Sequence, residues 1–237
     1  MNKSVQGVGL FITGTDTGVG KTYVGAALLH ALAQSGLRTA AMKPVATGCD
    51  STPLGLRNGD ALTLQQAATT RHAYELVNPY AFCPAIAPHI AAASAGVRID
   101  VEHIAKIAER LAQQCDCLIV EGVGGWRVPL NGREHVKDLA ARLGYPVLVV
   151  VGLRLGCINH ALLTVDAVKD DGVPFFGWIA NAVDAAYDTV EATVDAVSTH
   201  FGTQPLATLR WDPTGGPEPA GLRMKLLAWR LAQLAYR

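Results

Sequence analysis

The sequence predicts a doubly wound α/β fold, in which helices cover both faces of a mainly parallel β-sheet. Short apolar runs alternate with segments of helical periodicity, most plainly from residue 117 onward, and this alternation is typical of parallel sheets. Half of the 237 residues are hydrophobic but only 6% are aromatic, which suits a sheet buried between helical layers. Since no repeat or linker divides the chain, we expect a single domain over residues 1–237.

The N-terminal elements follow from apolar spacing. A strand is expected at the apolar run 8–12, and apolar residues at helical spacing predict a helix that begins near Lys21. A second strand, 39–42, ends at Lys43. Residues 44–59 are rich in Gly, Pro, Asn and Thr and are predicted to form a loop.

The remaining elements are read in the same way. Asp60 is expected to cap a helix that runs to about residue 70, and prolines then mark an irregular stretch. Helices are expected near 88–95, 101–114, 135–143, 158–170, 187–200 and, as an amphipathic C-terminal helix, 220–236. Strands are expected at 117–121, 147–151, 175–180 and 206–209.

A phosphate-binding loop lies between the first strand and the first helix. Residues 14–22 read Gly-Thr-Asp-Thr-Gly-Val-Gly-Lys-Thr. Glycines let backbone N–H groups turn toward phosphate oxygens, Lys21 can reach the β and γ phosphates, and the Thr22 hydroxyl can ligate Mg²⁺. The match is a variant, because Thr15 stands where the strict motif has Gly. The alternative, a glycine-rich turn that only caps a helix, is disfavoured by the strand–loop–helix context, so a P-loop NTPase type of fold is predicted.

Polar residues gather where the predicted strands end. Lys43, Glu121 and Asn181 each follow an apolar run, and residues 156–159 follow the strand 147–151. Because the carboxyl ends of parallel strands meet at one edge of a sheet, we expect these residues to lie beside the phosphate loop.

Position alone leaves three acidic and basic residues open to two interpretations. Glu121 is either an Mg²⁺ ligand or a solvated carboxylate, and the glycines that follow it favour the ligand. For Asp60 a helix N-cap is favoured over a ligand. Lys43 is either an exposed lysine or a charge that neutralises a transferring phosphoryl group.

Charge and cysteine content exclude other classes of protein. Twenty acidic and twenty basic residues give zero formal net charge, which argues against nucleic acid or an anionic membrane as the main partner. The longest apolar strand is too short to span a bilayer, and no secretion signal precedes the first strand. The five cysteines are scattered and form no disulfide framework. A cytoplasmic protein is expected.

Ordered motifs over residues 9–212 together resemble the dethiobiotin synthetase family. They include Thr-Gly-Thr-Asp-Thr and Val-Gly-Lys-Thr in the loop, Lys-Pro-Val-Ala-Thr-Gly at 43–48, and Val-Glu-Gly followed by Gly-Gly-Trp at 120–126. Further matches lie at 56–62, 77–80, 88–90, 155–161 and 180–181. The resemblance implies ATP- and Mg²⁺-dependent carboxylation of 7,8-diaminononanoate (7,8-diaminopelargonate) with CO₂, and closure of the cyclic urea of dethiobiotin in biotin biosynthesis.

The resemblance also implies roles for individual residues. Lys43 and Lys21 would be catalytic, and Thr22, Asp60 and Glu121 would bind Mg²⁺. Thr47 would hydrogen-bond the carbamate, and Asn181 would contact the adenine edge. The full nucleotide-binding set would be Gly18, Val19, Gly20, Lys21, Thr22, Tyr23, Asp60, Glu121, Gly122, Val123, Gly124, Asn181, Leu209, Arg210 and Trp211.

A second anion site is expected at the helix after strand 147–151. Its free N–H groups suit the distal carboxylate of the substrate. In the family this helix comes from the neighbouring subunit, so the resemblance implies a homodimer with shared sites. The residues concerned are Gly156, Cys157, Ile158 and Asn159.

The sequence departs from the family at two places and leaves rival classes open. Gly18 stands where some relatives have Glu, and Arg210 stands where relatives have Pro beside the base. A switch-type ATPase related to chromosome-partition and division-site proteins is one rival, but Asp16 stands where those proteins carry an extra lysine. The amidating synthetases of cobalamin biosynthesis and a non-catalytic nucleotide-binding module are the others.

Overall fold

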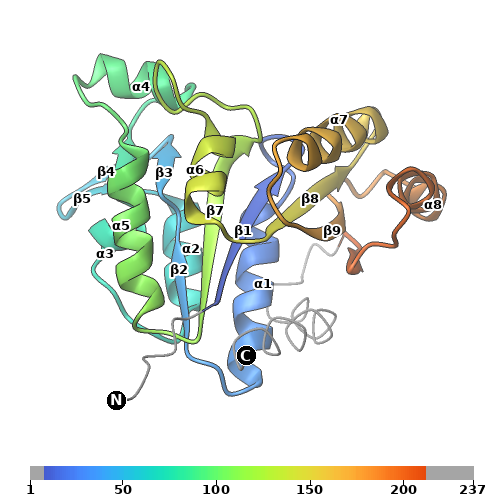
Figure 1. Cartoon of the computed structure of the whole chain (residues 1–237), viewed down its shortest axis with the longest axis horizontal. Coiled ribbons are helices and arrows are strands. Elements are labelled where there is room, and N and C mark those ends of the chain that lie inside the picture. The colour runs from blue at the N-terminus through green and yellow to red at the C-terminus, as the bar shows by residue number, and fades with distance from the viewer. Residues whose placement is uncertain (1–7, 212–237) are drawn as a thin grey trace.

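A computed structural model describes residues 8–211 of the chain (Figure 1). Within that range one parallel sheet has six strands in the order β10-β9-β8-β1-β7-β2. They are β1 (Val8–Gly14), β2 (Thr39–Met42), β7 (Cys117–Gly125), β8 (Val147–Leu153), β9 (Phe175–Ala182) and β10 (Ala207–Leu209). The predicted parallel α/β fold is confirmed.

Helices cover both faces of this sheet (Figure 1). On one face lie α1 (Lys21–Gln34) and α2 (Gly59–Ala67), and on the other lie α5 (Val101–Ala112), α6 (Val136–Leu143), α7 (Cys157–Asp170) and α8 (Val190–Phe201). Because the chain moves from β1 to β2 on one side and later returns to β8 on the other, the order of strands reverses at β1. Ligands bind at such reversal points, and the phosphate loop follows β1.

Alternation within β8 shows how one apolar run serves two cores. Val147, Val149 and Val151 pack into the core under α5 to α8, whereas Leu148 and Val150 pack into the core under α1 and α2. Since both faces of the strand are buried, its sequence has no polar alternation.

The predicted loop 44–59 contains secondary structure and is a correction. Strand β3 (Val45–Thr47) pairs in parallel with β6 (Tyr80–Phe82), and β4 (Asp50–Thr52) pairs with β5 (Gly55–Arg57). Each strand has three residues, which is too few to show a period, and β3 depends on a partner more than thirty residues away. Two short helices, α3 (Tyr74–Val77) and α4 (Pro88–Ser94), complete this region.

Two element ends also differ from prediction. Strand β7 continues past Glu121 to Gly125 because Gly125 still pairs with Gly14 of β1, although glycine disfavours strands. Helix α2 is capped by Asn58, whose side chain accepts a hydrogen bond from the Ala61 N–H at 3.2 Å, and not by Asp60. The predicted helix 220–236 lies outside the described residues.

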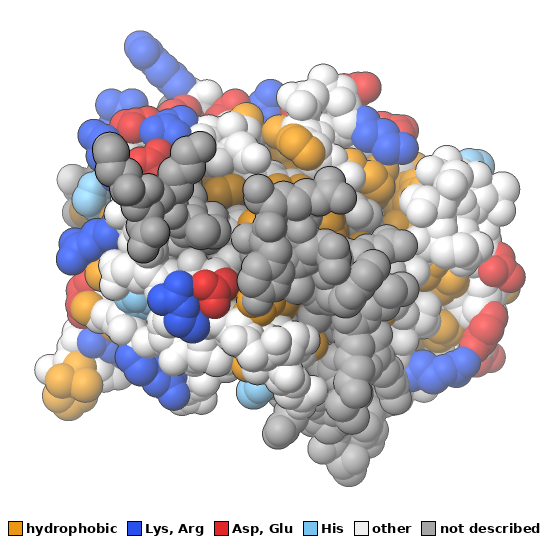
Figure 2. All heavy atoms as spheres, turned by 60° about the horizontal axis from the view of Figure 1, so that its bottom comes forward, with side chains coloured by type: hydrophobic (Ala, Val, Ile, Leu, Met, Phe, Trp, Pro, Cys, Tyr) orange, Lys and Arg blue, Asp and Glu red, His pale blue; other side chains and the backbone are white. Residues whose placement is uncertain are grey.

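The state of the cysteines and the distribution of surface charge match what the composition predicts. Cys115 and Cys117 are buried free thiols. No helix in the described range is long and apolar enough to cross a membrane. Figure 2 shows one face, on which acidic and basic side chains are interspersed.

Candidate active site

The phosphate loop joins β1 to α1, as the sequence predicts. Gly18 and Gly20 have φ of 74° and 85°, a conformation that glycine adopts at little cost. A Cβ at Gly20 would also lie 2.2 Å from Nδ2 of Asn181. The loop therefore needs glycine at position 20 for two reasons, its φ and its packing.

A cavity of about 700 Å³ opens in front of this loop. Walls from α1, β3, α2 and β7 meet there, so residues far apart in the sequence face one space. Ten of the predicted site residues line it: Gly18, Gly20, Lys21, Thr22, Lys43, Thr47, Asp60, Glu121, Val123 and Gly124.

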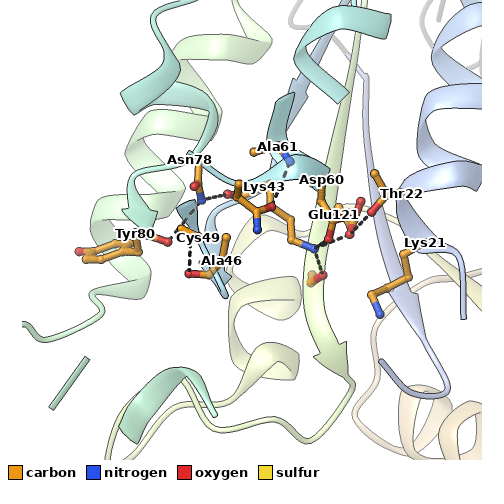
Figure 3. Close-up of polar contacts among 12 residues, drawn as sticks. Lys21, Thr22, Lys43, Ala46, Cys49, Asp60, Ala61, Asn78, Tyr80 and Glu121 are labelled. Carbon is orange, nitrogen blue, oxygen red and sulfur yellow. Dashed lines mark hydrogen bonds and ion pairs between the residues drawn. The ribbon is translucent and has the colours of Figure 1, made fainter. Parts of the chain in front are cut away.

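Lys43 lies at the centre of a polar cluster in the cavity wall (Figure 3). Its Nζ donates to Oε1 of Glu121, to Oδ2 of Asp60 at 3.1 Å and to the Gly122 carbonyl at 3.4 Å. The Thr22 hydroxyl donates to the same Oε1 of Glu121 at 3.0 Å. Lys43 is 4% exposed and Glu121 is 0% exposed, so position 43 is not a surface lysine.

The opposite charges within the cluster favour the ionised forms of Lys43 and Asp60. Burial alone would lower the pKa of Lys43, but the carboxylates of Glu121 and Asp60 outweigh it and raise that pKa above its usual value. Burial likewise opposes ionisation of Asp60, but Lys43 holds the pKa of Asp60 below its usual value. Burial, helped by the nearby charge of Lys43, lowers the pKa of Lys21 to about 8.

The donor set fits a hard divalent cation. Oε2 of Glu121 is buried and has no hydrogen-bond partner among the described residues, so an acceptor is available there. Thr22 and Asp60 add a hydroxyl and a second carboxylate from the same wall. Oxygen donors of this kind suit Mg²⁺.

A second cavity of about 300 Å³ lies on the other side of the loop. The predicted base-contacting residues Asn181, Arg210 and Trp211 line it together with Tyr23. Asn181 also holds the loop, since its Nδ2 donates to the Val19 carbonyl at 2.9 Å.

Other predicted nucleotide contacts point away from these cavities. The side chains of Val19 and Leu209 are each 1% exposed and pack in the core. Gly122 lines neither cavity, although its carbonyl accepts from Lys43. Any contact from Leu209 to a nucleotide would have to come from its backbone.

The predicted anion site at α7 does not share the large cavity. Gly156 caps α7 with φ of 90°, and the helix begins at Cys157, yet none of residues 156–159 lines that cavity. Cys157 is 3% exposed and belongs to the core, whereas Asn159 is exposed.

Sequence reasoning missed the residues that fix the backbone of Lys43. Asn78 Nδ2 donates to the Lys43 carbonyl at 2.7 Å, and the Lys43 N–H donates to the Val77 carbonyl at 2.8 Å. The Tyr74 hydroxyl donates to Asn78 at 3.0 Å and accepts from the Asn58 N–H at 2.8 Å. Asn58 also lines the cavity. Its position just before a predicted helix is the feature of the sequence that could have identified it.

Comparisons with known proteins agree on the class of the chain. A family model described as an AAA domain matches residues 8–218. An ATP-dependent dethiobiotin synthetase of Pseudomonas aeruginosa (strain UCBPP-PA14) is 56% identical over 182 residues, which are 76% of this chain and 80% of the relative. One from Marinobacter nauticus is 48% identical over 203 residues, covering 85% and 87%.

Among solved structures, the MinD cell division protein of Aquifex aeolicus superimposes with a TM-score of 0.61 at 16% identity. The match covers 95% of this chain and 97% of that one. At this identity the likeness extends to the fold alone.

Proposed function

Because this chain belongs to the ATP-dependent dethiobiotin synthetase family, we propose that its large cavity is the site where dethiobiotin is formed. The enzyme is a ligase that uses ATP to close a urea ring on 7,8-diaminononanoate with CO₂. The observation that carries the proposed site is that Lys43 and Thr47, from outside the phosphate loop, share one cavity with Lys21 and Thr22. We further propose that residues 1–237 act as one P-loop α/β domain. The test is formation of the cyclic urea from the purified protein and its substrates.

Three chemical steps follow from the substrates. One amine adds to the carbon of CO₂, loses a proton and gives a carbamate. The carbamate oxygen takes the γ-phosphoryl of ATP as ADP leaves, which forms a carbamic–phosphoric anhydride. The second amine attacks the carbonyl carbon and loses a proton, the C–O bond to phosphate breaks, and the five-membered ring closes as phosphate is released. ATP is needed because a carbamate oxygen is a poor leaving group until it is phosphorylated.

The phosphate loop holds the triphosphate in this proposal. Backbone N–H groups of residues 18–23, at the positive end of α1, donate to phosphate oxygens. Lys21 contributes an ammonium to the β and γ phosphates. Tyr23, Asn181 and Trp211 surround the base in the smaller cavity, and Arg210 lines the same space while it pairs with Glu191.

Lys43 and Thr47 act on the carbamate. The ammonium of Lys43 balances the negative charge of the carbamate and of the transferring phosphoryl group. The Thr47 hydroxyl, at the end of β3, donates a hydrogen bond to the carbamate. Before substrate binds, the Lys43 side chain is held by its carboxylates, and the backbone at Thr47 is held by the pairing of β3 with β6.

Thr22, Asp60 and Glu121 are the residues that would hold Mg²⁺, directly or through water. When bound, the cation supplies charge stabilisation to the β and γ phosphoryl oxygens. The unpartnered Oε2 of Glu121 provides the support for this assignment.

The Glu121→Gln variant is expected to need roughly 10- to 100-fold more Mg²⁺ for half-maximal activity, by analogy with other losses at metal sites. The reason is that an amide oxygen carries no negative charge for the cation. The measurement is a Mg²⁺ titration of ring closure at saturating ATP. Asp116→Asn is the matched control, because that carboxylate pairs with Arg38 outside the cavity. An unchanged titration of a folded Glu121→Gln protein would remove Glu121 from the metal's ligands.

The α7 N-terminus suggests a shared site in a homodimer. Its anion-binding groups lie outside the large cavity of their own chain, while the substrate has a carboxylate one aliphatic chain away from its amines. A second protomer that brings its α7 to this cavity would complete the site, as the family resemblance implies. The exposed Leu155 and Leu163, 95% and 63% exposed, give this face an apolar character.

Mixing two inactive variants tests the shared site. Lys21→Ala disables one phosphate loop, and Asn159→Asp places a negative charge where the substrate carboxylate would bind. Cys157 is unsuitable for the second variant because it is buried, whereas an acidic residue in the first turn of α7 favours the helix. Random assortment in a two-fold dimer is expected to restore about a quarter of wild-type activity, since half of the dimers are mixed and each has one intact site. A mixture that stays inactive, although mass measurements show that subunits exchange, would rule out shared sites.

A further inference from the structure

An ion pair connects the phosphate loop with the segment that leads into α7. Asp16 belongs to the loop, and Arg154 lies two residues before the Gly156 cap of α7. Nη2 of Arg154 is 2.5 Å from Oδ2 of Asp16. The pair therefore joins the two places where, in the proposed function, the substrates' phosphates and distal carboxylate bind.

Asp16 is also tied to the loop through its other atoms. Its Oδ1 accepts from the Thr17 N–H at 2.7 Å, and its carbonyl accepts from Nζ of Lys21 at 2.9 Å. The same residue thus holds the loop turn, the catalytic ammonium and the arginine of the α7 segment. Because Asp16 makes all three contacts, a movement of Asp16 at one contact also changes the geometry of the other two.

Nucleotide binding acts on the contact that Lys21 makes. The ammonium has three donors, so it can donate to phosphate oxygens while it keeps its hydrogen bond to the Asp16 carbonyl. Asp16 is then held by the nucleotide through Lys21 and by Arg154 through the ion pair. This continuous set of contacts leads from the phosphates to the residues that precede α7.

We propose that Asp16 and Arg154 are positioning residues that couple ATP binding at the phosphate loop to carboxylate binding at the α7 N-terminus. This inference rests on the proposed function, which makes the α7 N-terminus the carboxylate site. If α7 serves the neighbouring protomer, the coupling connects the two active sites of the dimer. Each substrate then strengthens binding of the other by the same factor, as linkage requires.

The alternative is an ordinary surface ion pair. The two side chains are 46% and 41% exposed, and pairs of that exposure contribute little to stability. Thermal stability therefore does not separate the two cases, but the coupling between ligands does.

The experiment measures the affinity of a non-hydrolysable ATP analogue with and without saturating diaminononanoate. In the wild type the ratio of affinities is expected to be about fivefold or more. Asp16→Asn keeps the acceptor for the Thr17 N–H but loses the charge, and Arg154→Gln removes the cation. Each is expected to bring the ratio close to one and to weaken the binding of each substrate in the presence of the other by the same factor. Arg154→Lys should restore most of the ratio.

Two comparisons keep the inference falsifiable. The double variant Asp16→Asn/Arg154→Gln should be no worse than either single variant, because both remove one interaction. Arg38→Gln, which breaks a similar surface pair with Asp116 far from the cavity, should leave the ratio unchanged. A wild-type ratio of one, or additive losses in the double variant, would overturn the coupling. If the wild type forms no cyclic urea at all, the proposed function fails instead.

Discussion

The Lys43→Met variant is expected to bind ATP nearly as well as the wild type but to lose turnover by a factor on the order of 10² to 10³. Met keeps much of the volume of the side chain and removes its charge together with the hydrogen bonds of the ammonium. In the proposed function that charge faces the carbamate and the moving phosphoryl group, which are most negative in the transition state. The measurement is kcat for ring closure beside the dissociation constant of an ATP analogue.

A control is needed because Lys43 also neutralises the buried Glu121. Removing one member of a buried ion pair can cost about 3–5 kcal/mol of stability, so part of the lost activity could come from unfolding. The double variant Lys43→Met/Glu121→Gln leaves no unpaired buried charge and should regain thermal stability without regaining turnover. If Lys43→Met alters only ATP affinity, Lys43 is a nucleotide-holding residue and its proposed role is wrong.

The Lys21→Ala variant is expected to lose ring closure by a factor on the order of 10² or more, together with affinity for ATP. Its ammonium is placed for the β and γ phosphates, and no other lysine or arginine among the residues lining the described cavity belongs to the loop. The assay compares kcat/KM for ATP in the variant and in the wild type. Near-normal values in a folded variant would contradict the assignment of the loop.

The lowered pKa of Lys21 adds a pH dependence to the same prediction. With a pKa of about 8, the amine of the free protein loses its proton as pH rises through that value. Affinity for an ATP analogue should therefore be full below pH 8 and should fall above it. In Lys21→Arg the charge persists over this range, so the fall should disappear.

Those parts of the fold that depend on local pattern could be predicted from the sequence. The phosphate loop, the helix after it and the strand that precedes Lys43 each leave a signal within about ten residues. The parallel topology also predicts that Lys43, Glu121 and Thr22 meet at one edge of the sheet. The carboxyl ends of parallel strands all lie on that side. The mutual contacts of these three side chains lie where that reasoning placed them.

The parts that were missed depend on contacts distant in sequence. Strand β3, which carries Thr47, exists because β6 pairs with it, and three residues contain no usable period. The sequence predicts Asp60 as the cap of α2, but Asn58 two residues earlier is an equally good capping residue. The structure uses Asn58 and leaves the Asp60 carboxylate for Lys43. The Asp16–Arg154 pair spans 138 residues, and no local signal announces it.

The most direct test of the proposed function is to incubate the protein with ATP, Mg²⁺, bicarbonate and diaminononanoate. Mass spectrometry then follows the organic product, and a phosphate assay follows ATP consumption in the same tube. We expect one cyclic urea and one phosphate for each ATP consumed, with both products lost in Lys21→Ala and Lys43→Met. Hydrolysis of ATP that proceeds without diaminononanoate, and yields no cyclic urea when it is added, would contradict the proposal.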